Sequence, residues 1–79
     1  MLDRIVVKKV IGIKQCTKLL KSDEGKVLYV AKDANAQLIS PIIQLAKEKN
    51  IDIVEITTMK ELGKISGIDV KSSAVLTLE

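Results

Sequence analysis

Residues 10–21, with the sequence Val-Ile-Gly-Ile-Lys-Gln-Cys-Thr-Lys-Leu-Leu-Lys, contain the change of pattern that decides the fold. A β-branched pair typical of a strand reaches Gly12, and a helical pattern starts directly after it. Apolar side chains then recur every three or four residues and so share one face of a helix. They are Ile13, Cys16, Leu19 and Leu20. The stretch therefore predicts a short strand over residues 9–12 that gives way to a helix with one buried side.

The opposite face of this predicted helix is polar and basic. It carries Lys14, Gln15, Lys18 and Lys21. No acidic residue lies between Asp3 and Asp23 to neutralise these amines. A helix start also presents free N–H groups and the positive end of the helix dipole, so this surface is suited to a polyanion. Spacing alone leaves open the alternative of an ordinary solvated face.

Composition excludes several classes of protein. The chain has 79 residues, 47% of them hydrophobic, so we expect a single domain over residues 1–79 with a dense aliphatic core. Tyr29 is the single aromatic residue, which argues against modules that stack several bases on aromatic side chains. One cysteine and no histidine leave no internal disulfide and no pattern for a zinc site. We expect a cytoplasmic protein without a metal or cofactor.

Membrane association and catalysis are not indicated. No stretch approaches the roughly 18 consecutive apolar residues of a membrane span, and no signal-peptide core follows Met1, so we expect a soluble protein. The net charge of +3 favours nucleic acid only mildly. Without histidine, no side chain is poised for acid–base chemistry near neutral pH, and the glycines match no nucleotide-binding loop. Cys16 falls on an apolar face and Asp33 lacks a companion acid, so both are interpreted as structural.

Helices and strands alternate along the rest of the chain. The apolar runs at residues 27–31 and 74–78 predict two buried neighbouring strands, and residues 51–56, which include two acidic residues, predict an exposed edge strand. Helices are expected over about residues 2–8, 36–49 and 59–66. This order predicts an α/β fold, a three-layer α/β/α sandwich on a small mixed sheet of four strands.

Two of these helices carry start signals. In the helix over residues 36–49, we expect Ser40 at the N-cap and Pro41 at the first helical position, after a preceding turn. In the last helix, Thr58 and Glu61 have the spacing of a capping box.

Three segments taken together resemble one known family. They are Gly-Ile-Lys-Gln-Cys-Thr-Lys at 12–18, Val-Leu-Tyr-Val-Ala-Lys-Asp-Ala at 27–34 and Leu-Gly-Lys-Ile-Ser-Gly-Ile at 62–68. In this order and spacing they are similar to the kink-turn RNA-binding superfamily of ribosomal proteins. It includes the archaeal seven-Ae protein, the eukaryotic large-subunit protein thirty-e and small bacterial YbxF-like members, and the Lys14-Gln15 pair resembles the bacterial branch most closely.

The resemblance implies a protein that binds and stabilises a kink-turn, and we expect a non-enzymatic monomer. This RNA is a helix–bulge–helix bent sharply at tandem sheared G·A pairs, and family members lay the start of this helix into its opened major groove. Gln15 stands where the family has a glutamate that accepts from guanine, and as an amide it can donate and accept. Lys18 matches the family's lysine. Lys14 stands where the family usually has an asparagine, so the resemblance does not define which base contacts this residue makes.

The resemblance also implies contacts from two loops. Residues 68–71 match a loop whose apolar side chains cover an extruded base, with Ile68 and Val70 tucked into the core as the alternative. Lys32 matches a position that contacts the RNA backbone, with a solvated lysine as the alternative. The complete predicted RNA-binding set is Gly12, Ile13, Lys14, Gln15, Lys18, Lys21, Lys32, Ile68, Asp69, Val70 and Lys71.

Two questions stay open at the level of sequence. The same lysines could dock an acidic protein, which makes a protein-interaction module the alternative class of function. The RNA itself could be ribosomal, a riboswitch or another transcript, because nothing in the chain selects among them.

Overall fold

The computed structural model describes residues 8–68 and 70–78. Its elements in order are β1 (Lys9–Ile11), α1 (Ile13–Lys21), β2 (Val27–Ala31), α2 (Ala36–Glu48), β3 (Asp52–Ile56), α3 (Met59–Ile65) and β4 (Ala74–Thr77). Each agrees with its expected range to within one residue at either end. The helix expected over residues 2–8 falls almost entirely outside the described residues. None of the described helices is long and apolar enough to cross a membrane.

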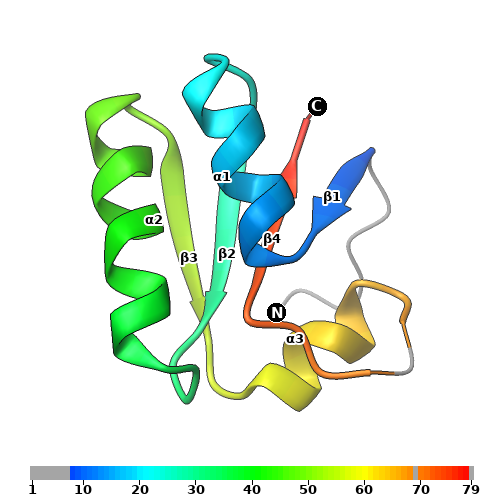
Figure 1. The fold of residues 1–79 in the computed structure, drawn as a ribbon. Coiled ribbons are helices and arrows are strands. Elements are labelled where there is room, and N and C mark those ends of the chain that lie inside the picture. The colour runs from blue at the N-terminus through cyan, green and yellow to red at the C-terminus, as the bar shows by residue number, and fades with distance from the viewer. Residues whose placement is uncertain (1–7, 69, 79) are drawn as a thin grey trace.

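The four strands form one mixed sheet in the order β1-β4-β2-β3 (Figure 1). β4 is antiparallel to both of its neighbours, whereas β2 and β3 are parallel. β3 is an edge strand and β4 is central, as the two patterns predicted. Figure 1 also shows that α1 and α2 begin at the end of the sheet where α3 lies.

Alternate residues of the central strands bury two separate cores. Leu28, Val30 and Leu76 pack with α1 and α2 on one face of the sheet. Ala31 and Val75 pack with α3 on the other face. Because side chains alternate across a strand, continuous apolar sequence is what a sheet covered on both faces requires. The predicted three-layer α/β/α sandwich is confirmed.

The start of α2 differs from the prediction. Ser40 is not the N-cap, because the helix is continuous from Ala36 and its N-cap is Asn35, whose side chain accepts a hydrogen bond from the Gln37 N–H at 2.8 Å. Pro41 lies inside the helix on an exposed position, where it lacks the N–H that would reach the Gln37 carbonyl. Buried isoleucines on both sides of the proline hold the two segments in one helix, and this burial outweighs one missing hydrogen bond. The predicted cap at Thr58 is present, since its side chain accepts from the Glu61 N–H at 3.0 Å.

Cys16 lies on the buried side of α1, as predicted. Its side chain is fully buried, and the thiol lies 3.7 Å from the Val10 carbonyl oxygen, to which it donates. Desolvation raises its pKa from the ordinary 9.0 to about 12. The thiol is therefore a packed, unreactive group near neutral pH.

This burial predicts a loss of stability at high pH. Between about pH 9 and 12 the folded chain keeps a proton that the unfolded chain releases, so the free energy of unfolding should fall with rising pH. The contribution approaches about 1.4 kcal/mol per pH unit. Urea unfolding of the wild type and of Cys16→Ala from pH 8 to 11 measures it as a difference in slope. Parallel curves would show that the thiol does not contribute.

Candidate nucleic-acid interface

Gly12 joins β1 to α1 within a single residue. Its backbone has φ 105° and ψ 146°, in a region where glycine is favoured because a side chain would be strained. The Gly12 N–H donates to the Ala74 carbonyl at 2.9 Å, and its carbonyl accepts from the Cys16 N–H at 3.0 Å. Gly12 therefore makes a bond to β4 and the first bond of the helix.

The start of α1 is uncapped and carries no acidic residue in its first turn. The N–H groups of Ile13, Lys14 and Gln15 precede the first intrahelical donor, and no described residue caps them with a side chain. The Lys14 and Gln15 side chains are both exposed. Free N–H groups, the positive end of the helix dipole and a lysine thus lie together, which is favourable for an anion.

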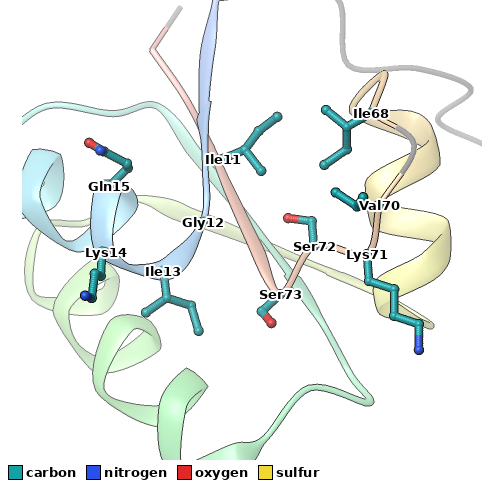
Figure 2. A pocket seen from close by; sticks show the side chains of 10 residues that line it. All are labelled: Ile11, Gly12, Ile13, Lys14, Gln15, Ile68, Val70, Lys71, Ser72 and Ser73. Carbon is teal, nitrogen blue, oxygen red and sulfur yellow. The ribbon is translucent and has the colours of Figure 1, made fainter.

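An open groove of about 430 Å³, here called the α1 groove, connects this helix start with the loop after α3 (Figure 2). Its lining residues are Ile11, Gly12, Ile13, Lys14, Gln15, Ile68, Val70, Lys71, Ser72 and Ser73. In Figure 2 the side chains of Ile11 and Val70 point toward one another, and Ile68 lies beside Val70. The groove therefore has an apolar wall facing the polar start of α1.

The two polar side chains lie at the rim of this groove. Figure 2 shows Lys14 and Gln15 extending outward from α1, and their polar ends are not directed at Val70. Neither side chain is packed inward, because both are exposed. A ligand in the groove would meet backbone N–H groups and apolar side chains first, and the lysine and amide at its edge.

The loop after α3 is held against that helix by backbone contacts. The Ile68 N–H donates to the Gly63 carbonyl, and the Ser72 N–H donates to the Met59 carbonyl, both at 3.1 Å. A Cβ at Gly63 would clash with the Val70 carbonyl oxygen, so only glycine allows this approach. Val70 is 68% exposed, so the alternative that placed it in the core is wrong, whereas Ile68 is half-buried.

The structure brings together most of the predicted site. Seven predicted residues line the α1 groove: Gly12, Ile13, Lys14, Gln15, Ile68, Val70 and Lys71. Lys18 and Lys21 extend the basic surface along α1, around a shallow depression that they share with Lys14. Lys32 is exposed in the turn after β2 and does not line the groove. Asp69 lies outside the described residues.

Sequence reasoning missed four contributors to this site. Ile11, Ser72 and Ser73 line the groove, and Gly63 positions its apolar wall. The available signal for Ile11 was its place directly before Gly12. Gly63 was noted only as part of a motif, because its role depends on a residue that approaches it in space.

The comparison of sequences gives the class of protein to which this α/β/α domain belongs. The chain belongs to the Ribosomal protein L7Ae/L30e/S12e/Gadd45 family, whose model matches residues 5–79. The family assignment confirms the prediction of a non-enzymatic protein.

Individual relatives span most of the chain. An "RNA-binding protein" of Bacillus pumilus (strain SAFR-032) is 47% identical over 66 residues, which are 84% of this chain and 80% of the relative. "RNA-binding protein YbxF" of Geobacillus stearothermophilus is 38% identical over 71 residues, 90% of this chain and 87% of the relative. "Large ribosomal subunit protein eL8" of Halobacterium salinarum (strain ATCC 29341 / DSM 671 / R1) is 33% identical over 64 residues, 80% of this chain and 53% of that protein.

A solved structure supports the fold alone. A protein with unknown function from Bacillus halodurans C has a TM-score of 0.82 to this chain at 12% sequence identity. The similarity covers 91% of this chain and 72% of that one.

Proposed function

We propose that this protein binds RNA and, within RNA, recognises and stabilises the kink-turn. The observation that carries the proposal is the α1 groove, which sets an uncapped, basic helix start opposite an exposed apolar wall. Membership of a ribosomal protein family and relatives named as RNA-binding proteins support an RNA partner. We further propose a single-domain monomer that acts in the cytoplasm, on ribosomal or other kink-turn RNAs.

The polar side of the groove would contact phosphates and guanine edges. Free N–H groups at the start of α1 suit phosphate oxygens, and the Gln15 amide can both donate to and accept from a base edge. Lys18, one turn further along the exposed face, can reach guanine acceptors or phosphate. A recognition surface of this kind needs few side chains, because bent RNA is identified largely by its shape and backbone.

The apolar wall would cover a base that leaves the stack. Val70 exposes a β-branched side chain to water, and Ile11 and Ile68 continue the apolar surface behind it. An extruded base placed on this wall would remove apolar area from water. Since a regular duplex has no extruded base, this contact favours the bulged RNA over the duplex.

Binding would act on the RNA by population shift. The free RNA samples extended and bent forms, and a protein that binds only the bent form moves the equilibrium toward it. Dyes on the two RNA arms should therefore show increased energy transfer as the protein is added.

A titration with matched RNAs tests the proposal. We expect a kink-turn to bind at least about tenfold more tightly than the same duplex with its G·A pairs replaced. The loss of even one bidentate contact between a side chain and a base costs about 1.4 kcal/mol or more, and 1.4 kcal/mol corresponds to a factor of about ten in affinity. Equal affinities for the two RNAs would exclude kink-turn recognition. Displacement of both RNAs alike by a polyglutamate peptide would instead favour an acidic protein partner.

Lys18→Ala tests whether this lysine contacts bases. We expect a loss of ~1–3 kcal/mol in binding if Lys18 contacts guanine edges, and a smaller, strongly salt-dependent loss if it contacts only phosphate. Lys26→Ala is the control, since Lys26 is an exposed lysine that precedes β2 at the other end of the sheet. Identical affinity of wild type and Lys18→Ala would remove Lys18 from the site.

A further inference from the structure

A second groove, of about 560 Å³, lies on the α3 side of the same loop. Its lining residues are Lys60, Lys64, Ile68, Val70 and Lys71. Ile68, Val70 and Lys71 also line the α1 groove, so these three residues form a ridge between the two grooves. We call the second depression the α3 groove. None of its residues on α3 belongs to the predicted RNA-binding set.

The α3 groove is basic, because three of its five lining residues are lysines. Lys60 and Lys64 are exposed and lie one turn apart on α3, where side chains at this spacing are neighbours. Figure 2 shows the Lys71 side chain extending from the ridge on the side of α3. Among the described residues, none of these three amines takes part in an ion pair. Within residues 8–68 and 70–78, no carboxylate lines the groove, although Glu61 is exposed on the same helix.

Three lysines around one groove favour a chain of phosphates over a single anion. Lysine ammonium groups act as point charges and supply no planar fork for a base edge. The described residues of the groove also include no amide or aromatic side chain that could recognise a base. Its contribution would therefore be to affinity and orientation, and not to sequence preference.

We infer that the α3 groove holds the phosphate backbone of the second arm of the bent RNA, on the far side of the ridge from α1. The inference rests on the proposed function, because it assigns a place to the RNA that the α1 groove would bind. With the kink over the ridge, one arm lies along α1 and the other along α3. The protein would then hold both arms of the bent RNA, one in each groove.

The double variant Lys60→Ala/Lys64→Ala tests this inference by its salt dependence. Removing two phosphate contacts should lower the slope of log affinity against log salt by about 2 and weaken kink-turn binding by about 3- to 10-fold near 0.1 M salt. Lys26→Ala/Lys47→Ala is the matched control, with the same change in net charge at the opposite end of the sheet. Thermal unfolding checks that both variants are folded, and Lys60→Gln/Lys64→Gln repeats the test without removing the side chains.

Shortened RNAs show whether one arm is responsible. The deficit of the double variant should disappear when one particular arm of the kink-turn is trimmed and persist when the other is trimmed. The inference would be overturned if the double variant kept the salt slope of the wild type, or if the control pair lost as much affinity for the kink-turn. It would also be overturned if trimming either arm left the loss of affinity in the double variant unchanged. A double variant that bound polyglutamate more weakly but RNA as tightly as the wild type would also overturn it.

The same titrations distinguish a failure of the α3 groove from a failure of the proposed function. If the wild type prefers the kink-turn and the double variant binds it equally well, the α3 groove is excluded and the proposed function stands. If the wild type has no preference for the kink-turn, the proposed function fails, and the assignment of the second arm fails with it.

Discussion

Replacing Gly63 by alanine is expected to lower the melting temperature by about 5–10 °C and to weaken RNA binding in the same variant. In most helices this substitution is favourable by about 1 kcal/mol, because alanine has the higher helix propensity. Here the added methyl group would clash with the Val70 carbonyl, a backbone atom, while hydrogen bonds at Ile68 and Ser72 hold the loop to α3. Overpacking of this kind costs about 1–3 kcal/mol, so the clash should prevail.

The two effects share one cause. Relief of the clash requires the ridge to move away from α3, and the ridge forms the apolar wall of the α1 groove. Thermal unfolding and kink-turn titration of the same preparation measure both. Val70→Ala is the matched variant, because it shortens the exposed side chain and leaves the backbone contact with Gly63 in place.

Val70→Ala should weaken RNA binding with almost no change in melting temperature, since a largely exposed side chain contributes little to the core. Unchanged stability and unchanged binding in Gly63→Ala would show that the loop accommodates the methyl group freely. The ridge would then not depend on this glycine.

The fold was predictable because its signals are local and agree with one another. Continuous apolar sequence at β2 and β4 identified the sheet as covered on both faces, and Asp52 and Glu55 identified β3 as an edge. The error at α2 arose where two local signals competed. Ser40 before Pro41 is a good start signal, but Asn35 caps the helix earlier, and burial on both sides of the proline decides the outcome.

The site was only half accessible from sequence, for a geometric reason. The basic face of α1 follows from helical periodicity, so Lys14, Gln15 and Lys18 could be named as exposed. The approach of Ile68 and Val70 to α3 depends on contacts in space that only the folded chain defines. The α3 groove could not be predicted for the same reason. In the sequence, Lys60 and Lys64 have the pattern of an ordinary solvated helix face, and only the folded chain shows that the ridge lies beside them.

Lys14→Glu is expected to stabilise the protein and to weaken its binding to RNA. A carboxylate in the first turn of α1 would interact favourably with the helix dipole, by about 0.3–1 kcal/mol. It would also stand one turn before Lys18, a spacing at which opposite charges add about 0.2–0.5 kcal/mol. The melting temperature should therefore rise by several degrees.

The same carboxylate would oppose RNA at the entrance of the α1 groove. It removes a lysine from the rim and places a negative charge where phosphate would lie, beside the free N–H groups. We expect a loss of about 2–3 kcal/mol in kink-turn binding, or roughly 30- to 150-fold. Because stability rises while binding falls, a folding defect cannot account for the result.

Lys47→Glu is the control, because it changes the net charge by the same amount as Lys14→Glu. It should lower the stability of the protein and leave its binding to RNA nearly unchanged. Lys47 is exposed in the last turn of α2, where a carboxylate faces the negative end of the helix dipole and should destabilise the protein by a few tenths of a kcal/mol. Lys47 lines neither groove, so kink-turn binding should change only by the general effect of net charge. Equal losses of binding in Lys14→Glu and Lys47→Glu would mean that RNA responds to the overall charge of the protein, and the start of α1 would lose its special role.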